Sequence, residues 1–430
     1  MSVGSQFMED SDADRPHRPT RKEAIALSEQ QCITVGASAL QPKGCDLVFI
    51  GRGDYIEGQV LKGARQAVDR RLLPADTRIF TVDRNPVTPD QLREDEEHIV
   101  MDLRQLSDYT VLRDRLGRTA GRRVIFFLAA GQTLIGDIAR GLMYEGLAQG
   151  DSILVVEKPV GDDQASSLAL QARLRRMLGD DRVVFNDHYL AKQSLWSLAH
   201  GEHPTPLTPA LWHRRSVSGV QVSTLEDRGI GTRAPYFDRT GLLKDVFCHL
   251  MKVVCTLAME PGRPWADARL EVLRHVRIGD SVRGQYRAAN GMAGYLDEVG
   301  VPPGSQAETY FGLTLQVDTP RWRGVPWFIE AGKRCSQRRG LATVATVASD
   351  RSPLEIPLHA ADDHDPLPHA RILQEAYAGR TTLWTPRHEV TEEWGIVDRI
   401  LRHWADEAVP LHLYDAGTDR PAAARQLYRS

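Results

Sequence analysis

The chain has 430 residues, of which 42% are apolar and 26% are charged, and its formal net charge is −3. This balance is ordinary for a globular protein and gives no general attraction to nucleic acid or to an anionic membrane. No apolar run approaches the roughly 20 residues of a membrane-spanning helix, and the N-terminus lacks the apolar core of a signal peptide.

The cysteine pattern bears on compartment and metal binding. The number of cysteines is odd and none of them forms a CxxC pair, so neither a disulfide framework nor a zinc site is expected. A reducing cytoplasm fits this pattern, and no metal site is predicted. The five residues are Cys32, Cys45, Cys248, Cys255 and Cys335.

Residues 1–44 are polar and are predicted to form a tail. From 45 to 190, apolar segments alternate with segments of helical length, such as residues 59–71. This alternation predicts a parallel sheet of the dinucleotide-binding kind. The expected strands are the run that begins at Cys45, then RIFTVDR (78–84), RRVIFFLAAG (122–131), DSILVVEKP (151–159) and VVFNDHYL (183–190).

Residues 191–430 are predicted to form a second, α+β domain that binds substrate. The segment 217–226 alternates apolar and polar residues, which predicts a half-buried strand. A long, mostly buried helix is expected at 241–260, and two strands are expected around the PRWRGVP turn within 308–334. Further helices are predicted near 367–379 and 387–406.

The sequence GRGDY follows the first expected strand. Gly51 and Gly53 would let the backbone approach a pyrophosphate, which the next helix N-terminus would favour. Glycine turns at strand ends are common, so this loop is a weak signal by itself. The candidate cofactor contacts in the loop are Gly51, Arg52, Gly53 and Asp54.

The second expected strand ends at Asp83 and Arg84, where such domains meet the adenine ribose. An aspartate there would bond the 2′-hydroxyl of NAD, whereas an arginine would pair with the 2′-phosphate of NADP. Asp83 could equally be a solvated carboxylate at a strand end. The residues leave the choice between the two cofactors open.

The stretch FNDHYLAKQ concentrates titratable groups, namely Asp187, His188, Tyr189 and Lys192. An anion site beside a proton-transfer site would need such residue types, because it combines a cation, hydrogen-bond donors and an acid. A charged surface run could also contain them. These residues by themselves do not decide between the two interpretations.

Several motifs together resemble the glucose-6-phosphate dehydrogenase family. EKPVG (157–161), FNDHYLAK (185–192) and GVPWFIEAGKR (324–334) correspond to the family's EKPxG, RIDHYLGK-like and GVPF…GK segments. DVFCHLMKVVCTLAMEPG stands where the family has QNHLLQ…AMEKP, and RHEVTEEWGIVDRIL and YDAG also fit. The order is consistent from about residue 46 to about residue 425, which an unrelated dinucleotide-binding oxidoreductase would not reproduce by chance.

This resemblance implies a Rossmann-like N-terminal domain and a C-terminal α+β domain with a large, mainly antiparallel sheet. It also implies oxidation of the C1 hydroxyl of a cyclic sugar 6-phosphate, with hydride transfer to NADP or NAD. His249 would be the general base, and Asp187 would orient it and stabilise its imidazolium. The phosphate would be held by His188, Tyr189 and Lys192.

Other residues take roles in the sugar pocket by the same resemblance. Lys158 would sit between substrate and cofactor, Glu226 and Asp245 would accept hydrogen bonds from sugar hydroxyls, and Lys333 and Arg338 would close the site. Plain structural alternatives exist for three candidates. His249 could be a packed helix residue, Lys192 a solvated one, and Glu226 part of a charged turn.

The chain also departs from the family pattern. The family loop reads GASGDL, so GRGDY is one residue shorter and contains Arg52. The charge of Arg52 could attract a pyrophosphate, whereas the shorter turn could move the helix N-terminus off the phosphate. Gly131–Gln132 replaces a Pro-Pro pair, and Glu330 stands where an arginine is common, so its carboxylate would disfavour an anion. Phe247–Cys248 replaces Gln-Asn with one residue fewer back to Asp245, which is a turn of about 100° on a helix.

The segment between Arg338 and Leu367 is much shorter than in the family. We therefore expect the second, structural NADP site of some members to be absent, and a homo-oligomer, if formed, to have an altered interface. Because the changes cluster where sugar hydroxyls and cofactor are contacted, the substrate could be another sugar phosphate or a nucleoside 5′-phosphate. A non-catalytic sugar-phosphate-binding protein is the remaining alternative.

Overall fold

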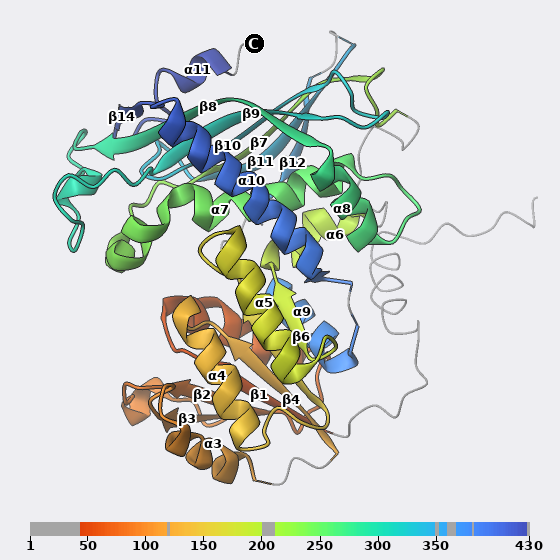
Figure 1. Cartoon of the computed structure of the whole chain (residues 1–430), viewed down its shortest axis with the longest axis vertical. Helices are drawn as coiled ribbons and strands as arrows, with labels where there is room; N and C mark the ends of the chain where they lie inside the picture. Colours follow the sequence, from red (N-terminus) through yellow and green to blue (C-terminus); the bar gives the residue numbers. More distant parts are fainter. Residues whose placement is uncertain are drawn as a thin grey trace, which may run out of the picture. The chain divides into compact units, whose positions relative to one another are not determined.

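The computed structural model describes residues 44–117, 121–199, 211–348, 352–358, 367–380 and 382–427. Two seven-stranded sheets organise these residues, and helices pack against both (Figure 1). The predicted tail lies outside the described residues except for Gly44, so it stays a prediction.

The first sheet has the strand order β13-β6-β5-β4-β1-β2-β3, and all pairings are parallel except that of β13 with β6. The chain reverses its direction of progress between β1 and β4. In open α/β sheets the ligand crevice lies at such a reversal, outside the carboxyl ends of the strands. The strands are β1 (Gly44–Ile50), β2 (Arg78–Asp83), β3 (Glu96–Val100), β4 (Arg122–Leu128), β5 (Ser152–Glu157), β6 (Val183–Asn186) and β13 (Trp384–Thr385).

The helical connections of this sheet follow the predicted alternation. The helix expected at 59–71 is present as a π-helical turn, η1, that continues into α2. The segments are η1 (Ile56–Val60), α2 (Leu61–Asp69), η2 (Pro89–Gln91), η3 (Leu106–Asp108), α3 (Tyr109–Leu116), α4 (Gln132–Tyr144) and α5 (Gln164–Leu178).

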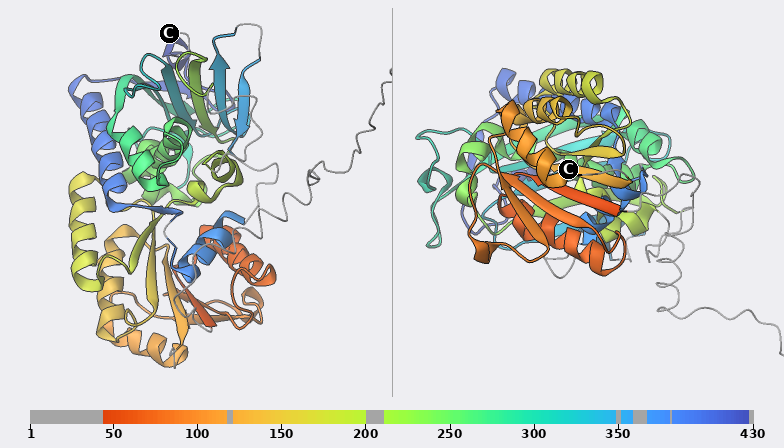
Figure 2. Two further views of the ribbon diagram at one scale, coloured as in Figure 1. Left: turned by 90° about the vertical axis from the view of Figure 1, so that its right-hand side faces the viewer. Right: turned by 90° about the horizontal axis from the view of Figure 1, so that it is seen from below.

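A late part of the chain also belongs to this first sheet. Helix α9 (Leu367–Ala378) packs against α2 and β4, as the left view of Figure 2 shows, and β13 pairs with β6. Ile372, Leu373 and Ala376 of α9 are fully buried in a cluster that also contains Ile56. The first sheet therefore includes α9 and β13, which come from beyond the predicted boundary at residue 190.

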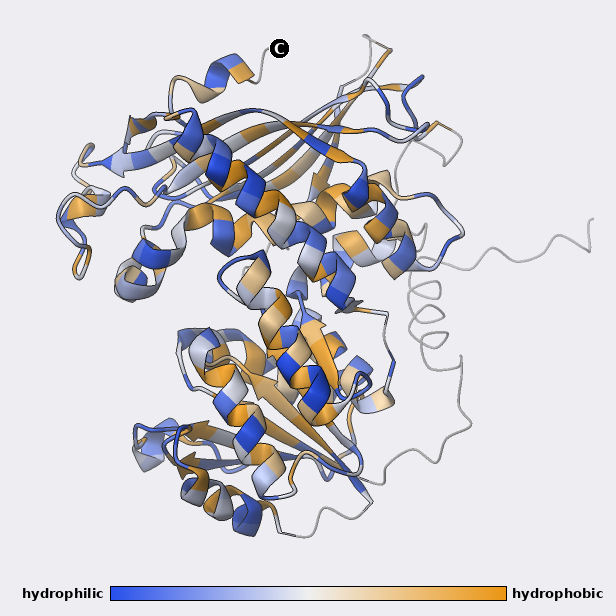
Figure 3. Cartoon of the chain, viewed as in Figure 1, coloured by the Kyte–Doolittle hydropathy of each residue, from blue (hydrophilic) through white to orange (hydrophobic). Residues whose placement is uncertain are grey.

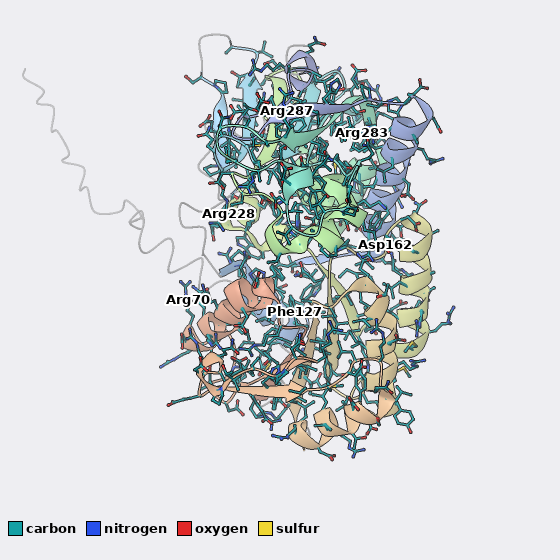
Figure 4. All side chains as sticks on the ribbon, turned by 90° about the vertical axis from the view of Figure 1, so that its left-hand side faces the viewer. Arg70, Phe127, Asp162, Arg228, Arg283 and Arg287 are labelled. Atoms are coloured by element: carbon teal, nitrogen blue, oxygen red, sulfur yellow. The ribbon has the colours of Figure 1, made fainter. Side chains whose placement is uncertain are left out.

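Burial explains why most of these strands were recognisable. All seven residues of β1 are buried, and Figure 3 shows the apolar colour continuing along the strands of the first sheet. Phe127, labelled in Figure 4, is fully buried among them. A parallel sheet covered on both faces favours such continuous apolar runs. The edge strand β3 has the sequence EEHIV. It was not predicted, because its charged residues do not form an apolar run.

The second sheet has the order β12-β11-β7-β10-β9-β8-β14 and is mainly antiparallel, as expected; β7 with β10 and β8 with β14 are the parallel pairs. The predicted pair of strands around PRWRGVP is confirmed as β9 and β10. The strands are β7 (Val217–Leu225), β8 (Val276–Arg287), β9 (Tyr310–Val317), β10 (Pro326–Gly332), β11 (Arg339–Thr346), β12 (Leu354–Pro357) and β14 (Leu411–Asp415).

The prediction that 217–226 is half-buried was wrong, because every residue of β7 from Val220 to Leu225 is buried. Its polar residues find partners inside the sheet. Ser223 donates to Glu330 Oε1 at 2.8 Å, and Gln221 donates to the same oxygen at 3.1 Å. Alternating polarity therefore reflects an internal hydrogen-bond network here rather than a solvated face.

The helices of this part include the long one predicted at 241–260; in the structure it begins earlier, at Ala234, and ends at Ala258. The two C-terminal helices predicted near 367–379 and 387–406 are confirmed as α9 and α10. Within the described residues, none of the helices combines the length and the apolar character needed to cross a bilayer. The remaining helical segments are η4 (His188–Ala191), α6 (Gln193–Ala199), η5 (Gly231–Arg233), α7 (Ala234–Ala258), α8 (Trp265–Arg274), η6 (Tyr295–Asp297), α10 (Arg387–Asp406) and α11 (Ala424–Leu427).

Candidate active site

Asp187 ends β6 and begins η4 at the carboxyl edge of the first sheet. The strand expected at 183–190 stops at Asn186, because the Asp187 side chain caps the following turn. Its Oδ1 accepts the backbone N–H of Tyr189 at 3.0 Å. This bond between neighbouring residues fixes the Asp187 carboxylate, which is 2% exposed, independently of distant partners.

His249 is positioned by a break inside α7. Gly241 has φ +66, and a Cβ there would lie 2.3 Å from Glu308 Oε1, so only glycine fits. Glu308 Oε1 accepts the backbone N–H of Leu243 at 2.9 Å and thereby caps the second half of the helix. That half carries His249 toward the end of β6.

His249 and Asp187 form a buried pair. The distance from His249 Nδ1 to Asp187 Oδ1 is 2.6 Å, and His249 is 7% exposed. An ionised carboxylate can only accept a hydrogen bond, so Nδ1 of the neutral imidazole carries the proton and Nε2 is left with a free lone pair.

The charge states of this pair suit a general base. Burial lowers the pKa of His249 well below its usual range, although Asp187 opposes this. Burial would raise the pKa of Asp187, but His249 and Lys158 outweigh it and hold that pKa below its usual range. At neutral pH the imidazole is neutral and the carboxylate is ionised, which is the state required for proton abstraction.

Three predicted phosphate-binding residues surround this pair. The Tyr189 ring stacks on His249 with centroids 4.3 Å apart, and the Lys192 ammonium lies 3.5 Å from the centroid of Tyr189. The His188 ring lies 4.7 Å from that of His249. Burial and Lys192 lower the pKa of His188 to about 3. Lys192 therefore supplies the positive charge, while His188 and Tyr189 supply neutral hydrogen-bonding groups.

The residues predicted for the sugar pocket are held by internal bonds. Lys158 Nζ donates to the backbone carbonyl of Asp245 at 2.7 Å, and Lys333 Nζ pairs with Glu226 at 2.8 Å. The Asp245 carboxylate accepts from Arg233 at 3.2 Å and from the Tyr236 hydroxyl at 3.1 Å.

The charges of Lys158 and Lys333 also act on Asp245. Burial would raise the pKa of Asp245, but Arg233, Lys158 and Lys333 lower it below its usual range. These bonds join Lys158 to Asp245 and Lys333 to Glu226, and Lys158 lines one cavity together with Asp187. Arg338 lies exposed on the surface, directly before β11.

Glu330 does not face this site as an unpaired charge. It is fully buried, and Arg420 Nη2 contacts its Oε1 at 2.7 Å. The Tyr310 hydroxyl donates to its other oxygen at 2.8 Å. The expected repulsion of a bound anion by Glu330 is therefore wrong, because its charge is neutralised inside the second sheet.

The loop after β1 requires glycine at Gly51 and is open at Gly53. Gly51 has φ +98, and a Cβ there would lie 2.9 Å from the carbonyl oxygen of Ala129, so the turn requires glycine. Nothing lies within 4 Å of a Cβ built on Gly53, and Asp54 is exposed. The loop stands between β1 and β4, where the strand order reverses, with the N-terminus of η1 behind it.

Arg52 turns away from this loop. Its guanidinium contacts Glu57 and Glu96 and donates to Thr81 Oγ1 at 2.8 Å, and its side chain is 4% exposed. The backbone N–H of Arg52 donates to Asp83 at 3.1 Å. Any contribution of Arg52 to cofactor binding thus comes from the backbone, because its charge is neutralised by the two glutamates.

At the end of β2 both cofactor options remain available. The Asp83 carboxylate accepts backbone N–H groups from Arg52 and, at 3.0 Å, from Asn85, which leaves further lone pairs for a ribose hydroxyl. Arg84 is exposed and makes no hydrogen bond or ion pair with another described residue.

The structure adds residues that sequence analysis missed. The Tyr55 hydroxyl bonds His369 Nε2 at 2.9 Å, and Glu157 Oε1 lies 3.7 Å from His188 Nδ1. Burial raises the pKa of Glu157 to about 7. His369 comes from α9, whose return to the first sheet has no local signature.

Two further observations concern ligands. Gln132 Oε1 is buried without a partner among the described residues, at the start of α4 beside the crevice. The ligand atoms of Asp187, His188 and His249 lie within 4.8 Å of one another. We assign no metal to them, because Asp187 Oδ1 and His249 Nδ1 are already bonded to each other.

Comparison with known proteins agrees with this geometry. The family model described as glucose-6-phosphate dehydrogenase, C-terminal domain, matches residues 205–350 and 344–430, and the corresponding NAD binding domain matches residues 90–196. Glucose-6-phosphate 1-dehydrogenase of Gluconobacter oxydans is 31% identical over 386 residues, which cover 76% of this chain and 78% of that protein.

Two mycobacterial proteins agree over a larger share of the chain. Glucose-6-phosphate 1-dehydrogenase 1 of Mycobacterium tuberculosis is 28% identical and covers 90% of this chain and 88% of its own. The crystal structure of glucose-6-phosphate 1-dehydrogenase from Mycobacterium avium superimposes with a TM-score of 0.75 at 25% identity, over 90% of this chain and 97% of that one. The chain belongs to the glucose-6-phosphate dehydrogenase family of NAD(P)-dependent oxidoreductases.

Proposed function

We propose that this protein oxidises the carbinol carbon of a phosphorylated sugar, with NADP or NAD as the oxidant. The observation that carries this proposal is the buried His249–Asp187 pair at 2.6 Å beside the Lys192 ammonium. It combines a neutral base, an ionised partner and a cation within one site. Family membership supports the same reaction class.

The residues act on the substrate in distinct ways. Lys192 holds the phosphate by charge, and His188 and Tyr189 hydrogen-bond to it. His249 Nε2 takes the hydroxyl proton, and Asp187 stabilises the imidazolium that forms. A bound nicotinamide cofactor supplies the hydride acceptor.

For cofactor binding we propose that the backbone at Gly51, Gly53 and Asp54 contacts the pyrophosphate. Asp83 would bond a ribose hydroxyl and Arg84 a 2′-phosphate. Lys158 is half-buried and its ammonium bonds the Asp245 carbonyl of α7; burial lowers its pKa, but Cys248 and nearby carboxylates raise it above its usual range. Lys158 therefore stays charged at the junction of cofactor and substrate.

The identity of the sugar phosphate has two candidates. Glucose 6-phosphate is the first candidate, from the names of the relatives. A second candidate is another sugar phosphate or a nucleoside 5′-phosphate, which the engagement of Asp245 by Arg233 and Tyr236 favours. Asp245 is then less available to the hydroxyls that it was predicted to contact.

The test is a panel of phosphorylated sugars assayed for nicotinamide reduction with each cofactor. We expect one substrate to be oxidised by the wild type and its kcat to fall by about 10²–10⁴-fold in His249→Ala, as removal of a general base predicts. Binding of sugar phosphate without turnover of any panel member would instead support a non-catalytic protein. The neutralised Arg52 is the observation on which that alternative rests.

We also propose a reducing compartment, the cytoplasm, and a homo-oligomer with an altered interface. Cys45, Cys248, Cys255 and Cys335 are unpaired in the described residues, whereas Cys32 lies outside them. Light scattering coupled to size exclusion would give the oligomeric state. A strictly monomeric active enzyme would contradict the proposed oligomer.

A further inference from the structure

A small cavity lies beside the His249–Asp187 pair, between the end of β6 and helices α7 and α10. Its volume is about 40 Å³. One side is apolar, with Val390, Trp394 and Val397. The polar side contains Lys158, Asn186, Asp187, Cys248, Lys252, Thr385 and Glu393. A volume of this size holds about two water molecules if enough polar groups face it.

Three buried polar atoms without partners belong to residues that line this cavity. They are Asn186 Oδ1, Asp187 Oδ2 and Thr385 Oγ1, none of which has a hydrogen-bond partner among the described residues. Buried acceptors in folded proteins are nearly always bonded to protein or to ordered water. Three such atoms on residues that line one cavity therefore point to water rather than to empty space.

The two oxygens of Asp187 have unequal surroundings. Oδ1 accepts from both His249 and Tyr189, whereas Oδ2 faces no donor. A carboxylate bonded at only one oxygen can rotate about its Cβ–Cγ bond and exchange the two. A donor at Oδ2 would oppose that rotation and keep Oδ1 on His249.

Across the cavity, Glu393 is held by a buried ion network. Lys252 Nζ contacts Glu393 Oε1 at 2.6 Å and Glu389 Oε1 at 2.5 Å, and Arg269 contacts Glu389 Oε2 at 3.1 Å. Lys252 and Glu389 are fully buried, and Glu393 is 6% exposed. Because these residues come from α7, α8 and α10, the Glu393 carboxyl is fixed by packed helices.

Glu393 can bond a water molecule in either protonation state, because water both donates and accepts hydrogen bonds. Burial raises the pKa of Glu393 to about 8, although Lys252 opposes this. Asp187 also contributes to this rise, which agrees with the two carboxyl groups facing the same cavity.

We propose that ordered water in this cavity joins Glu393 to Asp187 Oδ2, and that Glu393 and Lys252 are positioning residues for the His249–Asp187 pair. This inference rests on the proposed dehydrogenase function. Glu393 touches neither substrate nor cofactor. It acts by keeping Asp187 oriented toward His249 during proton transfer.

The kinetic test compares Glu393→Ala with Glu393→Gln, whose amide keeps a donor and an acceptor at the same place. We expect kcat to fall by about tenfold in Glu393→Ala, with unchanged KM for the sugar phosphate and the cofactor, because one water-mediated bond to a charged group is lost. Glu393→Gln should restore kcat to within about threefold of the wild type, since its amide still forms that bond. Glu392→Ala, one residue earlier on α10, is the matched control and should behave as wild type.

Loss of Glu393 leaves the buried Lys252 ammonium with one carboxylate fewer, which could destabilise the fold. The double variant Lys252→Met/Glu393→Ala separates such a folding defect from a catalytic one. It removes both members of the pair and should show the same tenfold loss of kcat. Wild-type kcat in folded Glu393→Ala and in the double variant would overturn the proposal.

A crystal structure of the wild type at high resolution tests the water directly. Density bridging Glu393 and Asp187 Oδ2 is the expected result, and a dry cavity would overturn the inference. This measurement does not depend on turnover, so an inactive wild type would refute the proposed function while leaving the water site to be judged by its density.

Discussion

Replacement of Asp187 by asparagine isolates the charge of the catalytic pair from its geometry. In the wild type, Asp187 Oδ1 accepts from His249 Nδ1 at 2.6 Å and from the backbone N–H of Tyr189 at 3.0 Å. An asparagine oxygen can accept both bonds with the same shape. What it cannot supply is the negative charge that stabilises the His249 imidazolium when the substrate hydroxyl loses its proton.

The magnitude follows from the burial of this pair. A charge-assisted hydrogen bond contributes about 1.5–3 kcal/mol against about 0.5–1.5 kcal/mol for a neutral one. A buried charge that loses its partner costs about 3–5 kcal/mol. Since His249 becomes charged only during the reaction, we take about 2–4 kcal/mol of lost transition-state stabilisation. This corresponds to a decrease in kcat of about 30- to 1,000-fold.

The assay is steady-state reduction of the nicotinamide cofactor at saturating sugar phosphate. KM for both substrates should change by less than about threefold, since Asp187 contacts neither of them and a transition-state effect leaves KM unchanged. The matched control is Asp181→Asn, an exposed position just before β6, which should keep wild-type kcat. A folded Asp187→Asn enzyme with kcat within threefold of the wild type would refute this account of the base.

Other predictions concern the anion site, the cofactor and stability. Lys192→Ala should raise KM for the sugar phosphate by about 10- to 100-fold, because one charge-assisted contact to phosphate is lost; an unchanged KM in initial-rate measurements would remove Lys192 from the phosphate site. Arg84→Ala should raise KM for NADP and leave KM for NAD unchanged, as measured with each cofactor in turn, and equal effects on both would argue against contact with a 2′-phosphate. Burial and His188 lower the pKa of His369 to about 3 in the folded protein, whereas its pKa in the unfolded chain is about 6.5. Between these two pH values the unfolded chain binds a proton at this imidazole and the folded protein does not. Stability is therefore lost as pH falls from about 6.5 toward about 3, and His369→Gln should reduce the drop in urea midpoint between about pH 7 and about pH 5; an unchanged drop would show that His369 titrates normally.

The amino-acid sequence determined much of the fold because the strands of the first sheet are buried on both faces. Continuous apolar runs such as RRVIFFL leave little choice of structure, and β4 appears where they predict it. Strands that contain charged or polar residues were harder to predict, because other residues of the fold bond to those groups. β3 was missed for its charges, and β7 was taken as half-buried because its polar residues bond to Glu330 inside the sheet.

Part of the site was also readable locally. Asp187, His188, Tyr189 and Lys192 lie within six residues, and a turn at a strand end brings such neighbours together whatever the rest of the chain does. The family resemblance then selected His249 from among the histidines of the chain. Its approach to Asp187 depends on the break at Gly241, which fixes the direction of the second half of α7.

Only the tertiary structure decided how distant charges pair. The sequence shows Arg52 in the nucleotide loop, but packing turns its guanidinium onto Glu96 of β3. Likewise, His369 and Glu393 reach the site from α9 and α10, and no local pattern predicts either approach. The physical reason is that burial forces each charge to find a partner. Which partner it finds depends on which helices and strands the fold brings into contact.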